Sequence, residues 1–138
     1  MSGARRVVIY TDGAARGNPG PAGAGVRIEG PDGAALAEVA EYLGEATNNV
    51  AEYKALLLGL ERARSLGASE IEVRSDSELL VRQMTGAYKV RNEGLRPLVA
   101  RAHALADAFA SVAYVHVRRE GNRDADRLAN LAIDRNGP

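Results

Sequence analysis

The stretch that most constrains the fold is residues 7–20, VVIYTDGAARGNPG. Its first five residues are β-branched or aromatic, which predicts a buried strand. Asp12 ends this strand and turn-forming residues follow, a common place for an aspartate because its side chain can bond the turning backbone. Three other acids stand where a strand or loop leads into a predicted helix: Glu52, Asp76 and Asp126. The sequence therefore raises the question of whether four acids form one site.

The order of the predicted elements indicates a mixed α/β sheet. We expect strands at 5–12, 22–30, 34–43, 70–75 and 111–117, and helices at 50–66, 76–86, 95–110 and 123–135. The turn Pro31-Asp32-Gly33 predicts a hairpin between the second and third strands. Three antiparallel strands followed by strands that alternate with helices predict two further strands parallel to the first. The 138 residues suit a single domain spanning 1–138.

Composition narrows the chemistry. The chain has no cysteine and two histidines, so thiol nucleophiles and cysteine-based zinc sites are excluded. Carboxylates that bind hard metals remain. With 18 basic and 18 acidic residues, the net charge of zero argues against binding polyanions by bulk electrostatics. No apolar run reaches the roughly 20 residues of a membrane span, and the start lacks a secretory signal, so we expect a cytoplasmic protein.

Glu52 is the most informative acid. At helical spacing it falls within an apolar arc that includes Leu56 and Leu60, where a carboxylate is costly without a partner. A capping box, with Asn49 as N-cap, is the structural alternative. That alternative explains a glutamate at this position, but it does not explain why the glutamate faces the sheet.

The other helix-start acids also have structural alternatives. Ser75 with Glu78 forms a second possible capping box around Asp76. Favourable interaction with the helix dipole would account for Asp124 or Asp126.

Taken together, the acids favour a metal site. Parallel strands place Asp12 and Asp76 at the same, carboxyl edge of the sheet, where open α/β sheets carry their sites. Several acids with few cations need metal, and Mg²⁺ or Mn²⁺ suits carboxylate ligands. Two such ions could act on both sides of a phosphoryl displacement.

The glycine-rich segment 13–25 lacks both the P-loop and the GxGxxG pattern. We interpret it either as a plain connection or as a surface where the backbone and Asn18 approach a polymer backbone. His103 and His116 are interpreted as structural, since neither has a nucleophilic serine partner in the pattern.

Four ordered motifs now support a family resemblance. From about Val7 to Asp134 the chain resembles a type 1 ribonuclease H, and the matching segments are YTDGAARGNPGPAGAG, TNNVAEYKALLLGL, SDSELLVRQMTG and GNRDADRLAN. The resemblance implies a five-stranded mixed sheet flanked by helices. It also implies a monomeric enzyme that hydrolyses the RNA strand of RNA/DNA hybrids, leaving 5′-phosphate and 3′-hydroxyl ends.

The resemblance assigns roles residue by residue. It implies two Mg²⁺ ions, with Mn²⁺ as a substitute, held by Asp12, Glu52, Asp76 and Asp126, with Asp12 as the bridging ligand. It assigns substrate binding to Gly13, Asn18, Thr47, Asn48 and Asn49. Asparagine amides can both donate to and accept from a 2′-hydroxyl, the group that separates RNA from DNA.

Two departures from the family pattern matter. Many members carry a histidine shortly before the last aspartate, whereas this chain has Arg118 or Arg119, as in a subgroup resembling archaeal and actinobacterial enzymes that is reported also to cut double-stranded RNA. Arginine cannot shuttle a proton near neutral pH, so Arg118 would act electrostatically. By strand alternation Arg118 shares a side with His116 and Arg119 faces the other way, unless the strand has already ended. The basic protrusion of some members is also missing from 85–96.

Two other functions remain open from the sequence. A transposase, resolvase or exonuclease of the same fold would act on DNA, and the asparagines after Thr47 argue against it. A hybrid-binding module without catalysis is the other, and the presence of all four acids argues against that.

Overall fold

The computed structural model describes residues 5–136. The strands are β1 (Arg6–Ala15), β2 (Gly20–Glu29), β3 (Ala35–Ala46), β4 (Glu70–Ser75) and β5 (Ser111–His116). The helices are α1 (Asn48–Ser65), α2 (Glu78–Met84), α3 (Arg96–Ala106) and α4 (Arg123–Asn136), with a short 3₁₀ helix, η1 (Arg119–Asn122), directly before α4. Within residues 5–136 no helix is both long and apolar enough to cross a membrane.

The five strands form one sheet in the order β3-β2-β1-β4-β5. β1 is antiparallel to β2 and β2 to β3, whereas β4 is parallel to β1 and β5 is parallel to β4. The prediction of a mixed sheet with three antiparallel and then two parallel strands is confirmed. Because β1 and β4 run the same way, their carboxyl ends meet at one edge.

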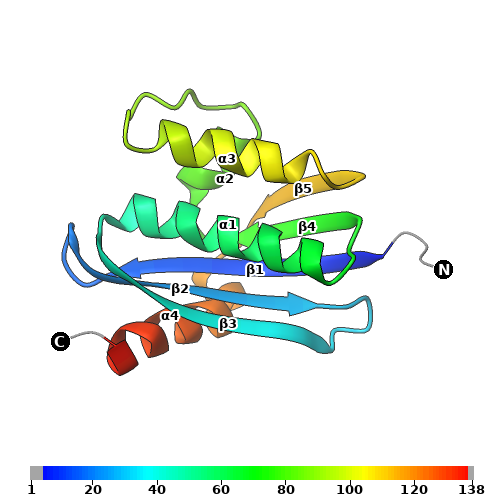
Figure 1. The fold of residues 1–138 in the computed structure, drawn as a ribbon, viewed down its shortest axis with the longest axis horizontal. Coiled ribbons are helices and arrows are strands. Elements are labelled where there is room, and N and C mark those ends of the chain that lie inside the picture. The colour runs from blue at the N-terminus through cyan, green and yellow to red at the C-terminus, as the bar shows by residue number, and fades with distance from the viewer. Residues whose placement is uncertain (1–4, 137–138) are drawn as a thin grey trace.

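Helices cover both faces of the sheet (Figure 1). On one face, α1 crosses β1 and β2, where Gly59 lies against Ile9 and Val26, and α3 lies beside α1. On the other face α4 packs against β2, with its backbone close to Gly25. Val26 and Gly25 are neighbours in the strand, so their opposite contacts place the two helices on opposite faces.

The interpretation of the glycine-rich segment 13–25 as a connection was wrong for most of its length, and the strand expected from residue 22 begins earlier, at Gly20. β1 continues to Ala15 and β2 begins at Gly20, so the connection spans only 16–19. A Cβ at Gly13 would overlap the Ala51 backbone of α1, and one at Gly25 would overlap the Ala125 carbonyl of α4. The glycines let helices approach the sheet closely, which a search for nucleotide-binding loops does not detect.

The observed bounds of other elements also differ from the predicted ones. β3 extends beyond the predicted residue 43 because Ala46 still pairs with Gly20 of β2. α3 ends at Ala106 rather than near 110, and a turn then places Phe109 in the core with 9% of its surface exposed. β4 has the predicted bounds, since its alternation of buried and partly exposed residues is regular.

Candidate active site

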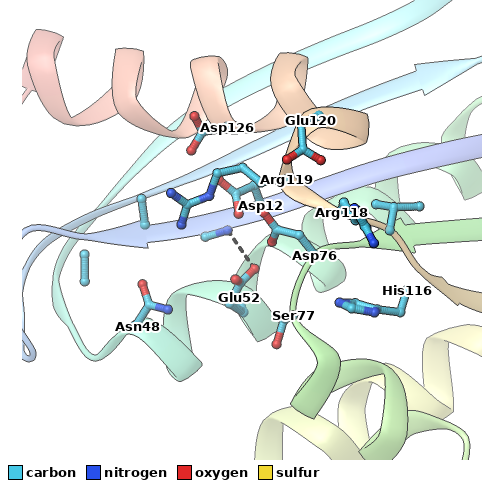
Figure 2. Close-up of a pocket in the computed structure, with 14 residues that line it drawn as sticks. Asp12, Asn48, Glu52, Asp76, Ser77, His116, Arg118, Arg119, Glu120 and Asp126 are labelled. Atoms are coloured by element: carbon cyan, nitrogen blue, oxygen red, sulfur yellow. Dashed lines mark hydrogen bonds between the residues drawn. The ribbon is translucent and has the colours of Figure 1, made fainter.

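A pocket of about 560 Å³ opens at the carboxyl edge of the central strands (Figure 2). β1, α1, the β4–α2 junction, the segment after β5 and α4 all contribute to it. Its lining residues are Asp12, Gly13, Ala14, Ala15, Asn48, Glu52, Asp76, Ser77, His116, Val117, Arg118, Arg119, Glu120 and Asp126. The structure therefore brings the four predicted acids into one pocket.

Three of the acids are close enough to share an ion. Asp12, Glu52 and Asp76 each offer a carboxylate oxygen, and these oxygens lie within 4.8 Å of one another. Asp126 lines the same pocket from the first turn of α4, but it is outside this three-residue group. Its carboxylate also accepts a hydrogen bond from Asn130 Nδ2 at 3.3 Å.

Glu52 faces the sheet as predicted, but it caps nothing. The N-cap of α1 is Thr47, whose hydroxyl accepts from the Val50 N–H, so the capping box starting at Asn49 was wrong. Glu52 Oε1 instead accepts a hydrogen bond from the Gly13 N–H at 2.9 Å, and only 6% of its surface is exposed. A carboxylate that also served as a cap would point along the helix rather than at β1.

The capping box that was the structural alternative around Asp76, Ser75 with Glu78, does not form. The N-cap of α2 is Ser77 rather than Ser75, and Glu78 pairs with Arg82 one turn later at 2.8 Å. The capping box of Ser75 with Glu78 was therefore wrong. Asp76 stands alone between the end of β4 and the cap of α2, facing the pocket.

The two helix-start acids of α4 have different surroundings. Asp124 lies 3.7 Å from Arg27 Nε and 3.6 Å from Arg127 Nη2, in an exposed ion-pair network. Asp126 faces the pocket instead. The helix dipole would stabilise Asp124 and Asp126 equally, so it does not distinguish them. Only their positions around the helix place one on the surface and the other in the pocket.

Burial and mutual repulsion raise the pKa values of two of these acids, Asp12 and Glu52. Desolvation, with the charges of Glu52 and Asp76 next in importance, raises the pKa of Asp12 to about 10. Burial raises the pKa of Glu52 to about 8, against the lowering effect of the Gly13 N–H. Among residues 5–136 no arginine, lysine or histidine forms a salt bridge with any of the four acids.

This donor set fits a hard divalent cation. Oxygen ligands converge from three carboxylates and a fourth is at hand. Within residues 5–136 no basic side chain forms a salt bridge with them, although Arg118 and Arg119 line the same pocket. Mg²⁺ and Mn²⁺ prefer such ligands, and they are bound through a few carboxylates together with water or phosphate oxygens. The pocket therefore suits metal-assisted chemistry on a phosphate.

The predicted substrate residues gather at one side of this pocket. Asn18 lies in the β1–β2 turn, and its Oδ1 accepts from the Asn48 N–H at 3.0 Å. Thr47, Asn48 and Asn49 occupy the exposed start of α1. Asn48 and Gly13 also line the pocket, whereas the other three lie outside its lining.

The two arginines depart from the predicted geometry. β5 ends at His116 and η1 begins at Arg119, so strand alternation no longer applies to this pair. Both Arg118 and Arg119 are exposed and line the pocket. The expectation that they face opposite ways applied only if the strand continued, and β5 ends two residues before Arg118. In the view of Figure 2, Arg118 lies on the side of His116 and Arg119 lies nearer Asp12.

Sequence reasoning missed three polar residues of the pocket. His116 was interpreted as structural, yet it is exposed and lines the pocket, and its two-residue spacing from Arg118 was the available signal. Ser77 lines the pocket and caps α2. Glu120 lies in η1, which no hydrophobic period marks, so nothing in the pattern pointed to it.

The mixed sheet with acids at its central carboxyl edge defines the ribonuclease H-like class of folds. Residues 10–132 match the model of a family described as reverse transcriptase-like. The chain belongs to this family and is a homologue of type 1 ribonuclease H.

Three relatives support this assignment. The bifunctional protein Rv2228c of Mycobacterium tuberculosis is 49% identical over 94% of this chain, which spans 36% of that protein's length. Ribonuclease HI of Halobacterium salinarum is 46% identical over 94% of this chain and 65% of its own length. The crystal structure of its ribonuclease H1 superposes with a TM-score of 0.92, covering 94% of this chain and 98% of that one. LC11-RNase H1, solved in complex with an RNA/DNA hybrid, is 48% identical, with a TM-score of 0.90 over 94% of this chain and 97% of that one.

Proposed function

We propose that this protein is a metal-dependent endonuclease that hydrolyses the RNA strand of RNA/DNA hybrids and leaves 5′-phosphate and 3′-hydroxyl ends. The observation that carries the proposal is the convergence of Asp12, Glu52 and Asp76 within 4.8 Å, in a pocket where residues 5–136 supply no salt-bridging cation. The relative LC11-RNase H1, bound to a hybrid, supports the substrate class.

The four acids would hold two Mg²⁺ ions, or Mn²⁺ in their place. Bound there, the ions would activate the attacking water and stabilise the leaving 3′-oxygen. Asp12, of whose surface 5% is exposed, would be a ligand of both ions. Glu52 Oε1 accepts from the Gly13 N–H, which holds this side chain in the lining of the pocket. Asp76 at the β4–α2 junction and Asp126 in the first turn of α4 line the same pocket and would complete the ligand set.

The two arginines would supply positive charge beside the scissile phosphate. Neither Arg118 nor Arg119 pairs with an acid in the described part of the chain, so both guanidinium groups are available to a phosphate. A guanidinium stays protonated and cannot act as a general base. We infer that this pair takes the electrostatic part of the role that a histidine plays in many family members.

Recognition of RNA would come from the start of α1. Asn18, Thr47, Asn48 and Asn49 lie together beside the acids, where the minor groove of a hybrid would present its 2′-hydroxyls. Asn18 braces Asn48 through the hydrogen bond to its N–H, which holds the β1–β2 turn against the helix. This arrangement favours a ribonuclease over a DNA-cutting enzyme of the same fold.

The test is cleavage of labelled RNA/DNA hybrid, double-stranded RNA and double-stranded DNA side by side, with Mg²⁺, with Mn²⁺ and with chelator. We expect metal-dependent cutting of the hybrid's RNA strand, and the double-stranded RNA arm shows how far specificity extends. Cutting of DNA would identify a DNA nuclease, and binding without turnover would identify a non-catalytic module.

A matched pair of α4 variants ties the activity to the pocket. Asp126→Asn should lower turnover strongly, because it removes a carboxylate that faces the site. Asp124→Asn, two residues away and paired with surface arginines, should leave turnover close to that of the parent. Equal losses in both variants would mean that the helix start, rather than the pocket, accounts for the effect.

A further inference from the structure

Asn122 is a buried polar residue that the proposed chemistry does not use. It is the last residue of η1, and 1% of its surface is exposed. Its Nδ2 donates to the Thr11 carbonyl oxygen at 2.9 Å, across 111 positions of sequence. Its Oδ1 has no partner among the described residues, so this amide is kept in the interior at a desolvation cost.

The hydrogen bond between Asn122 and Thr11 forms beside the acids, where the pairing of β1 with β4 ends. Pairing between β1 and β4 ends at Thr11 and Ser75, while β1 continues to Ala15 along β2. In an extended strand the carbonyl of Thr11 and the N–H of Gly13 point to the same side. Beyond the last pair no strand covers that side, and side chains reach these two groups instead.

The two contacts lie immediately before and after Asp12. Asn122 holds the Thr11 carbonyl that precedes it, and Glu52 holds the Gly13 N–H that follows it. The peptide groups on both sides of Asp12 are thus fixed by side chains from η1 and α1. This leaves little freedom for the Asp12 backbone.

In the sequence, Asn122 lies between the two pocket arginines and the pocket acid of α4. Arg118 and Arg119 precede it in the same loop, and Asp126 follows it by four residues, one helical turn into α4. Its bond to β1 therefore fixes the loop and the start of α4 relative to Asp12.

We propose that Asn122 is a positioning residue whose amide, by holding the Thr11 carbonyl, sets the separation between Asp12 and Asp126 and so the geometry of the metal ligands. This inference rests on the proposed metal-dependent function. Partners that orient metal ligands in this way typically change metal affinity or activity by roughly 10- to 100-fold when removed.

The test compares Asn122→Leu, which keeps the branched shape of the side chain without a donor, with Asn122→Ala. Mn²⁺ binding is measured by calorimetry without nucleic acid, and turnover of a hybrid is measured per folded protein, with kcat and KM separated. Asn136→Ala is the matched control, because Asn136 Nδ2 also donates to a carbonyl, that of Ala132, but at the far end of α4.

We expect Mn²⁺ affinity and kcat to fall by roughly 10- to 100-fold in both Asn122 variants, with KM for the hybrid nearly unchanged. The control should match the parent in both. Parental Mn²⁺ affinity and kcat, with only a lower melting temperature, would overturn the proposal and leave Asn122 a packing residue. If the parent binds Mn²⁺ but cuts nothing, the proposed function fails, and the Mn²⁺ comparison still decides the role of Asn122.

Discussion

The pocket has two unlike regions, a buried floor and an exposed rim. The floor consists of Asp12 and Glu52, which are 5% and 6% exposed. The rim consists of His116, Arg118, Arg119 and Glu120, which are all exposed and lie at the end of β5 and in the segment after it. Charges on the floor interact through a medium of low dielectric constant, whereas charges on the rim are screened by water.

This difference separates two tasks. The floor concentrates negative charge at a fixed place. The raised pKa values of Asp12 and Glu52 indicate that this charge is electrostatically unfavourable unless cations or protons bind. The rim offers positive charge that can follow a mobile phosphate with little reorganisation cost. Substitutions on the floor should therefore change activity far more than substitutions on the rim.

The strongest test of this contrast is Asp12→Asn. An amide cannot supply the charge that holds two metals, so we expect turnover to fall by about a thousandfold or more, a loss of at least about 4 kcal/mol in transition-state stabilisation. Without metal, the melting temperature should stay the same or rise, because one member of a repelling cluster is gone. Substantial residual cleavage, or a lower metal-free melting temperature, would contradict the clustered-acid floor.

The floor also makes stability depend on pH. The pKa of Glu52 is raised from an ordinary value of 4.5 to about 8 by folding, so the folded state binds more protons than the unfolded state between these values. The metal-free protein should thus lose stability as pH rises from about 5 to 8, by about 1–3 kcal/mol from this group. Urea unfolding at a series of pH values measures this, and Glu52→Gln should make the profile less steep, while the raised pKa of Asp12 leaves a slope in both proteins. A parent profile as flat as that of the variant would show that Glu52 ionises normally.

The two regions also differ in how far the sequence predicts them. The floor follows from strand direction and helical period: parallel β1 and β4 bring Asp12 to Asp76, and the apolar arc of α1 turns Glu52 to the sheet. Strand direction and helical period are properties of whole elements, so a wrongly predicted N-cap residue does not change where they place the acids. The capping boxes failed because Thr47 and Ser77 lie nearer the true helix starts.

The rim follows no such period. The strand ends at His116 and a 3₁₀ helix begins three residues later, so strand alternation does not decide how the two arginines come to line the pocket. Asn122 is set by a long-range bond to Thr11, and such a contact leaves no trace in a single sequence. The glycines at 13 and 25 were misread because their spacing suits a loop as well as close helix packing.

On the rim, Arg118→Ala and Arg119→Ala should each lower turnover by roughly tenfold, about 1.4 kcal/mol, because an exposed guanidinium stabilises transition-state charge only partly. Arg118→Lys should retain part of the rate. Arg64, an exposed arginine in the last turn of α1 and outside the pocket, provides the control variant Arg64→Ala. Parental turnover in both single variants at saturating Mg²⁺ would leave the rim without a part in the chemistry.

The smallest effect, and the one that separates the regions most cleanly, is on the salt dependence of hybrid binding. With a net charge of zero, few phosphates should be neutralised, so affinity should fall by less than about a thousandfold between 50 and 200 mM salt. Binding is measured in Asp12→Asn, which prevents cleavage, with and without Arg118→Ala. Each phosphate contact adds about 0.9 to the slope of log affinity against log salt concentration, so loss of Arg118 should reduce this slope by about one. The loss of affinity caused by Arg118→Ala should therefore be only roughly three- to fourfold larger at 50 mM than at 200 mM salt. Glu52→Gln in the same background should leave the slope unchanged, since a buried floor acid releases no counterions from the nucleic acid. A slope that responds to the floor variant and not to the rim variant would reverse the assignment of the two regions.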